Sequence, residues 1–446
     1  MMQTTLSRVY HFCLKKNTGL SIRRTTMAIL NAGNPSTMLS ALNMHGMFDL
    51  GVLGASMAQN AGCYDRQKRC YEFSGRKSTR RQVFRNGRVE KKTGPVSGFA
   101  VRLAEHLEKM WPVQVRIHNS GLDATPIQHV LDCFHSYIPH KVDAVIVDPG
   151  SMAKYSSTED LRRVVHRLQA LKTPPHIIFL LFHEWFGQRS RRFYELDEDN
   201  PWNRMERIAL QICREIDATC ISPRRELFSI VNKNHTKLLE FVGEDGLHIV
   251  NSEHGIDYVT ELLIRWIDVY QSRKVDRVNP LFVHRVSAAA SRCYRFGGRS
   301  PQRFRLLDWK TAPCPNCPSR NGSIPCNSDA TLWRFCAWVQ TKFKTKLSPS
   351  VRADIVNSTL MINLDTRLSQ NPMITLQHLT SFYDAGKVNY ACSSGCRCMP
   401  GRIDALNKSV QNSIFVPFYI HTTTASCVLT IALIRSPFRI RSIHVT

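Results

Sequence analysis

Residues 48–56, "FDLGVLGAS", join a run of apolar residues to a glycine and a serine. A short apolar run that ends at Gly54 is typical of a strand buried on both faces, with a tight turn after it. Ser56 would follow the carboxyl end of this strand, which is where ligands bind in open α/β sheets. This segment therefore predicts both a central strand and the edge of the sheet where a site would lie.

The same pattern recurs further along the chain. Apolar runs "VQVRIHN", "VDAVIVD", "HIIFLLF" and "ATCIS" alternate with segments of helical period such as "SGFAVRLAEHLEKMW" and "STEDLRRVVHRLQAL". Five short apolar strands separated by helices predict a mostly parallel sheet that helices cover on both faces. We therefore expect an α/β domain with a five-stranded, mostly parallel sheet in a flavodoxin-like three-layer arrangement.

Polar residues follow several of these strands and would meet at one edge of the sheet. They are Ser56, Asn119 to Gly121, Pro149 to Met152 and His183 to Trp185. The segment "GEDGLHIV", residues 243–250, adds Asp245 three positions before His248, just ahead of the last amphipathic helix. The group 183–185 has no metal-ligand partner at a suitable spacing, so we expect a pocket wall there.

A serine hydroxyl is a poor nucleophile unless a base takes its proton, and imidazole does so best when a carboxylate orients it. Ser56, His248 and Asp245 are therefore the candidate nucleophile, base and orienting carboxylate. Each residue also has a purely structural interpretation. Ser56 could be a small residue in a tight turn, His248 could cap the final helix, and Gly121 could serve only the backbone geometry.

Across about residues 48 to 270 the chain resembles the SGNH hydrolases, also called the GDSL esterase family. The first family block appears as "LGAS" with Ser56 at the nucleophile, the second as "HNSG" with the oxyanion glycine at Gly121, and the last as "DGLH" with Asp245 and His248. In the third block "PGSMA" stands where the family has Gly-x-Asn-Asp. Met152 takes the position of the family's oxyanion Asn and cannot donate a hydrogen bond, so we expect Ser151 to substitute or activity to be weak.

The resemblance implies a serine esterase that hydrolyses or transfers an acyl group, with acetyl on a glycan as the expected substrate and small esters as alternatives. A catalytically silent protein of the same fold that binds glycan or associates with a cell wall remains the alternative. Neither interpretation needs a cofactor, and we expect no metal.

Beyond about residue 273 the helical periods fade, and short segments of period two predict a β-sandwich or jelly roll. The tract "TSFYDAGKVNYACSSGCRC" resembles cysteine-bearing β modules appended to SGNH domains in algal and plant-like proteins. We therefore divide the chain into three parts. Residues 1–47 are a basic leader or a mis-predicted start, 48–272 the SGNH-like α/β domain, and 273–446 a cysteine-containing, β-rich accessory domain.

The composition bears on the partners. The chain has 446 residues and a formal net charge of +25, which attracts anions such as an acidic polysaccharide. No reading helix or regular interleaving of aromatic residues indicates specific nucleic-acid binding. The basic tract 76–92 is expected to be a solvated loop rather than an anion site. No apolar run is long enough to span a membrane.

Cysteines and acceptor sites bear on the compartment. The chain has 15 cysteines, and we favour disulfides over zinc for the late group, Cys314, Cys317, Cys326, Cys336, Cys392, Cys396, Cys398 and Cys427. N-glycosylation acceptor sites at Asn234, Asn321, Asn357 and Asn407 agree with a secretory-pathway lumen or extracellular location. The first 48 residues contain no acidic residue and resemble a transit peptide, so an organellar location is the alternative.

Overall fold

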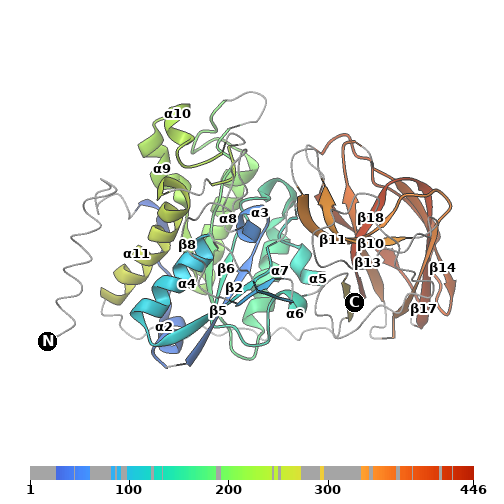
Figure 1. Ribbon diagram of the computed structural model, residues 1–446, viewed down its shortest axis with the longest axis horizontal. Helices are drawn as coiled ribbons and strands as arrows, with labels where there is room; N and C mark the ends of the chain where they lie inside the picture. The colour runs from blue at the N-terminus through green and yellow to red at the C-terminus, as the bar shows by residue number, and fades with distance from the viewer. Residues whose placement is uncertain are drawn as a thin grey trace.

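Figure 1 shows a computed structural model of the chain, with a mixed α/β part beside a part built of strands. The structure describes residues 27–44, 46–60, 82–85, 88–91, 98–121, 125–132, 134–186, 192–243, 246–249, 253–272, 292–295, 333–340, 345–367, 372–383, 385–410, 414–423 and 425–445.

A parallel sheet forms the centre of the α/β part. Its middle strands are β8 (Thr219–Ile221), β7 (His176–Leu180), β6 (Ala144–Val147), β2 (Gly46–Leu53) and β5 (Val113–Asn119), adjacent in that order and all parallel. These are the five strands that the apolar runs predict. The α/β class with a mostly parallel sheet is therefore confirmed.

Two hydrophobic cores lie on the two faces of this sheet, because successive side chains of a buried strand point to opposite sides. On β6, Ala144 and Ile146 join one core, and Val145 and Val147 join the other. The first core takes helices α2 (Ser36–Asn43), α4 (Phe99–Met110), α9 (Pro223–Val231) and α11 (Tyr258–Ser272). The second takes α5 (His129–Asp132), α6 (Phe134–Tyr137), α7 (Thr158–Gln169) and α8 (Pro201–Ile216).

Side-chain caps start two of the long helices, α7 and α8, at the positions that the sequence pattern predicts. The Ser157 hydroxyl accepts a hydrogen bond from the backbone N–H of Asp160 at 3.0 Å and caps α7. Asn200 caps α8 in the same way through the N–H of Asn203, and Pro201 occupies the first turn.

The sheet is larger than the five strands that we expected. Within the described residues it has eight, because β1 (Ile29–Asn31) adds antiparallel to β8, and the hairpin β3 (Gln82–Arg85) and β4 (Arg88–Lys91) adds beside β5. The hairpin falls within the basic tract 76–92, for which we expected a solvated loop. The sheet edges are the least predictable strands, because an edge strand needs no buried run on both faces.

The α/β core also begins before residue 48, where we placed its first residue. Ala28 and, on α2, Met38 and Leu42 are buried in the first core. Met38 and Leu42 stand four residues apart, which puts them on the same face of a helix. Residues 1–26 lie outside the part of the chain that the structure describes.

The carboxyl-terminal part consists of two antiparallel sheets. One contains β10 (Arg334–Gln340), β11 (Thr345–Ala353), β18 (Phe438–Val445), β13 (Met373–Thr380) and β16 (Ile414–His421), with β9 (Arg292–Arg295) paired to β18. The other contains β12 (Thr359–Asp365), β17 (Ser426–Arg435), β14 (Lys387–Ser394) and β15 (Gly401–Asp404). Residues of both sheets form one core, so the predicted β-rich part is confirmed.

The remaining helical segments connect these elements. They are α3 (Ser56–Asn60), η3 (Ala153–Tyr155), α10 (His235–Leu238) and the π-helical turn η4 (Glu253–Asp257) that leads into α11. In the part of the chain that is described, none of the helices has the length and apolar character that crossing a membrane requires.

Candidate active site

A tight turn carries the candidate nucleophile from β2 into α3. Gly54 has φ of +148°, and a Cβ atom at this position would lie 2.9 Å from the Cβ atoms of both Ala58 and Asp148. Only glycine adopts this backbone conformation in so little space. Ser56 is therefore held at the first position of α3, half-buried, at the carboxyl end of the central strand.

The candidate base stands on a closed loop near the end of the α/β part. Val242 and Ile249 form an isolated antiparallel bridge, and the N–H of Gly243 donates to the His248 carbonyl at 2.6 Å. The N–H of Trp185, after β7, donates to the Gly246 carbonyl at 2.8 Å. These bonds fix the loop that presents His248 against the segment that follows β7.

The two residues meet at the edge of the sheet that the strand pattern predicts. Ser56 Oγ and His248 Nε2 are 2.7 Å apart, within hydrogen-bond distance. When Nε2 carries no proton, the serine hydroxyl donates to it, which is the arrangement that a serine nucleophile needs. Asp245, the predicted orienting carboxylate, lies outside the described residues.

The segment after β5 brings Gly121 to the same edge but uses its N–H internally. The Gly121 N–H donates to Asn119 Oδ1 at 3.0 Å, and Asn119 Nδ2 donates to the Ala58 carbonyl at 2.9 Å. Asn119 therefore ties the loop after β5 to the helix that carries Ser56. The sequence pattern placed this asparagine within the second block but did not indicate its bridging role.

The loop after β6 contains the other predicted oxyanion group, Ser151. Its hydroxyl donates to the carboxylate of Asp148, and its N–H donates to Asp148 Oδ1 at 3.1 Å. Burial raises the pKa of Asp148 to about 6, although hydrogen bonds from Ser151 and from neighbouring N–H groups oppose this rise. As with Gly121, the polar hydrogen of Ser151 is engaged within the protein. Met152 follows it, half-buried, just before η3.

The segment 183–185 lines a small cavity behind the loop of His248. The cavity has a volume of about 20 Å³ and is also lined by Arg224, Leu247, Ile249 and Tyr258. Burial lowers the pKa of His183 well below its ordinary value, so its ring is neutral. The cavity can hold one water molecule and no acyl group. The expected wall therefore lines a small space next to the neighbours of His248, Leu247 and Ile249.

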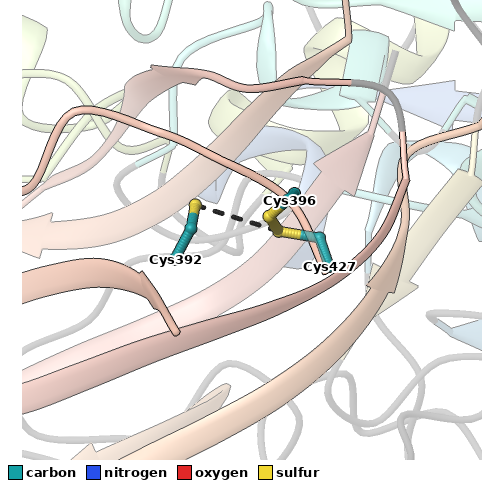
Figure 2. A group of neighbouring side chains, drawn as sticks. All are labelled: Cys392, Cys396 and Cys427. Carbon is teal, nitrogen blue, oxygen red and sulfur yellow. Dashed lines mark hydrogen bonds between the residues drawn. A yellow bond between two sulfur atoms is a disulfide. The ribbon is translucent and has the colours of Figure 1, made fainter. Parts of the chain in front are cut away.

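Three cysteine sulfurs lie close together in the carboxyl-terminal part, as the ligands of a metal ion would. A metal ion binds cysteine as the thiolate. The Sγ atoms of Cys392, Cys396 and Cys427 all lie within 4.8 Å of one another (Figure 2). These three cysteines take part in two disulfides, Cys392–Cys398 and Cys396–Cys427. The two disulfides are neighbours, because Cys392 Sγ and Cys427 Sγ are 3.8 Å apart. Oxidised cysteines offer no thiolate to a metal ion.

The disulfides predicted for the late cysteines are thus confirmed for these four. The structure adds Cys213–Cys220, which joins α8 to β8 and which the spacing did not indicate. Cys314, Cys317 and Cys326 lie outside the described residues.

The whole arrangement is similar to a known two-domain protein. The chain is similar to two crystal structures of a two-domain esterase (CEX) active on acetylated mannans, one of them co-crystallised with mannopentaose. Each match covers 94% of this chain and 97% of the esterase chain. Their TM-scores are 0.55 for the mannopentaose crystal and 0.56 for the other, and their sequence identities are 14% and 13%. At such low identity the likeness establishes the fold alone. No protein-family model matches this chain, and no curated protein matches it at a significant level.

Proposed function

We propose that this protein is a serine esterase of the SGNH type that removes or transfers acetyl groups on a glycan. The single observation that carries the proposal is the 2.7 Å separation of Ser56 Oγ and His248 Nε2 at the carboxyl edge of a parallel sheet. A serine that leads a short helix after a glycine turn, paired with a histidine from a distant loop, is the geometry that acyl transfer needs.

In the proposed reaction Ser56 attacks the ester carbonyl while His248 takes the hydroxyl proton. The histidine then gives this proton to the leaving alcohol, and water or an acceptor alcohol releases the acyl group by the same route. Asp245, three residues before His248, would orient the imidazole and stabilise its charged form.

The oxyanion would be held by backbone donors near Ser56. The N–H of Ser56 begins α3, and the first N–H groups of a helix have no acceptor within that helix. Gly121 and Ser151 are the further candidates, and each would have to exchange its present acceptor for the oxyanion. Met152 adds no donor, so the proposed enzyme is slower than one with asparagine at this position.

The choice of an acetylated glycan rests on two supports. The first is the printed activity of the similar two-domain esterase on acetylated mannans. The second is the likeness of fold over both parts of the chain, which extends over 94% of this chain and 97% of the esterase. The net charge of +25 favours glycans that carry acidic groups.

The proposal is tested with the full chain on p-nitrophenyl acetate and on an acetylated mannan. Wild-type protein should release acetate, and the variants Ser56→Ala and His248→Ala should lose about a thousandfold or more of kcat. Ser229→Ala serves as the control, because Ser229 lies on α9 and its hydroxyl donates to the Glu226 carbonyl within that helix. Equal rates for wild type and Ser56→Ala would exclude the esterase.

A catalytically silent glycan-binding protein is the second candidate. It is favoured by the engagement of the Gly121 N–H and the Ser151 hydroxyl within the protein and by Met152 at the asparagine position. Binding of acetylated mannan with no release of acetate would support this candidate.

A further inference from the structure

The carboxyl-terminal sheet is covered on the side that faces the α/β part. On β18, Phe438 and Ile440 belong to the inner core, yet Arg441 and His444 are also only 3% exposed. One face of an antiparallel sheet is commonly solvated, so burial on both faces requires a cover. Helix α5 contributes to this cover, since it lies against β18 (Figure 1).

Two side chains of this sheet bond to the segment 125–129, which leads into α5. The Arg441 guanidinium donates to Thr125 Oγ1, and both residues are buried. Gln377 Nε2, from β13, donates to the His129 carbonyl at 3.4 Å. The guanidinium of Arg441 also lies over the ring of Phe415, 3.5 Å from its centroid, which fixes its plane.

The segment 125–129 is linked through Tyr137 to the segment that follows β5. His129 Nδ1 lies 2.6 Å from the Pro126 carbonyl, and its ring packs edge-on against Tyr137 with centroids 5.0 Å apart. The Ser120 hydroxyl donates to the Tyr137 carbonyl at 2.6 Å. Ser120 precedes Gly121 directly, so this set of contacts reaches the proposed oxyanion side of the site.

The same segment contacts the loop that follows β6. Gln128 Nε2 donates to the Tyr155 carbonyl at 2.8 Å, and the Ile127 N–H donates to Ser156 Oγ at 3.3 Å. Tyr155 and Ser156 lie just after Ser151 and Met152. Segment 125–129 is therefore bonded directly to the loop after β6, and it reaches the loop after β5 through Tyr137.

We propose that Arg441 is a positioning residue for the active site, supplied by the carboxyl-terminal sheet, with Gln377 in support. Arg441 holds Thr125 and Gln377 holds the His129 carbonyl, so that the loops of Gly121 and Ser151 are fixed relative to Ser56. This inference rests on the proposed esterase function. A misplacement of about 1 Å far from the reacting atoms can cost about a hundredfold in rate, so a lost anchor would lower kcat without any change in the catalytic residues.

A matched control stands two residues away on the same strand. Arg439 is 6% exposed, and its Nε and Nη2 donate to Ser350 Oγ at 3.1 and 2.6 Å within the carboxyl-terminal part. Arg441→Met and Arg439→Met remove the same buried group from one strand. Only the first removes the bond to segment 125–129.

The test measures kcat and KM of the full chain on p-nitrophenyl acetate. We expect Arg441→Met to lower kcat by about ten- to a hundredfold with KM nearly unchanged, because oxyanion stabilisation acts in the transition state. Arg439→Met should keep kcat within about twofold when it is folded. Thr125→Val should resemble Arg441→Met, and the double variant should lose no more than the worse single variant, since the two residues form one interaction.

Hydrogen exchange gives a readout that does not depend on catalysis. Amides of residues 119–121, of Thr125 and of residues 127–129 should exchange faster in Arg441→Met than in wild type, and at the wild-type rate in Arg439→Met. Wild-type kcat in a folded Arg441→Met protein, or equal losses in the two arginine variants, would overturn the inference. If wild type shows no Ser56-dependent rate, the esterase proposal fails, and unchanged exchange in Arg441→Met then overturns the anchoring as well.

Discussion

Replacing Gly54 by alanine tests whether the turn before Ser56 is as tightly determined as its geometry indicates. The new Cβ atom would lie 2.9 Å from two other Cβ atoms and 3.0 Å from the Asp148 carbonyl oxygen. Gly46, at the start of the same strand, has nearly the same φ, +150° against +148°, but its Cβ would meet only the Met44 carbonyl at 3.9 Å. Gly46→Ala is therefore a control for the backbone alone.

The two variants, Gly54→Ala and Gly46→Ala, separate the free-energy cost of backbone strain from that of overpacking. A non-glycine residue at such a φ costs about 1–3 kcal/mol, which both variants share. Overpacking adds about 1–3 kcal/mol, and only Gly54→Ala incurs it. We therefore expect Gly46→Ala to lower the free energy of unfolding by about 1–3 kcal/mol and Gly54→Ala by about 1–3 kcal/mol more.

Urea unfolding followed by circular dichroism measures both free energies, and p-nitrophenyl acetate hydrolysis measures the effect on Ser56. Gly54→Ala should also lose about a hundredfold in kcat, because relief of the contacts moves Ser56 relative to His248. If both variants lowered the free energy of unfolding equally, the turn at Gly54 would accommodate the added Cβ without an overpacking cost. Glycine would then not be required at position 54.

Three other predictions concern the surroundings of the site. Burial raises the pKa of Asp148 from 3.8 to about 6, so the unfolded chain releases this proton first as pH rises, and this group should lower the stability of the wild type by about 2 kcal/mol between pH 4 and 7. Asp148→Asn should show a smaller loss in urea unfolding at the two pH values, and an identical loss would contradict the assignment. Met152→Asn should raise kcat on an activated ester by about tenfold if it supplies an oxyanion donor; a folded variant with no gain would show that the third block is misaligned. In protein from its native source, Cys392, Cys396, Cys398 and Cys427 should resist alkylation until reduced, and free thiols there would argue against a lumenal or extracellular location.

The sequence predicted the centre of the fold better than its edges. Strands buried on both faces, such as the one that holds Ala144 to Val147, need continuous apolar runs, which can be read without a structure. The strand at Ile29–Asn31 and the outer strand of the hairpin, Arg88–Lys91, each pair on one side only, so their sequences carry weaker constraints. Met38 and Leu42 gave a helical signal, but the basic character of the first 48 residues obscured it.

In the candidate site, too, some features could be predicted from the sequence and others could not. Ser56 and His248 are 192 positions apart. Both could be placed, because Ser56 follows an apolar strand and His248 lies in a glycine-containing loop just ahead of the last amphipathic helix. The acceptors of the Gly121 N–H and the Ser151 hydroxyl could not be predicted, because hydrogen-bond choice depends on loop conformations that periodicity does not encode. The bond between Arg441 and Thr125 joins two parts of the chain 316 positions apart, and no local pattern indicates it.

Covalent labelling of the nucleophile tests the central claim most directly. A fluorophosphonate reacts with a serine whose hydroxyl proton is taken by a neighbouring base, and peptide mass spectrometry identifies the residue that carries the adduct. We predict one adduct on Ser56 in the wild-type chain, none in Ser56→Ala, and labelling slowed by about a hundredfold or more in His248→Ala. A wild-type adduct on another serine, or labelling of Ser56 at the same rate in His248→Ala, would contradict the account.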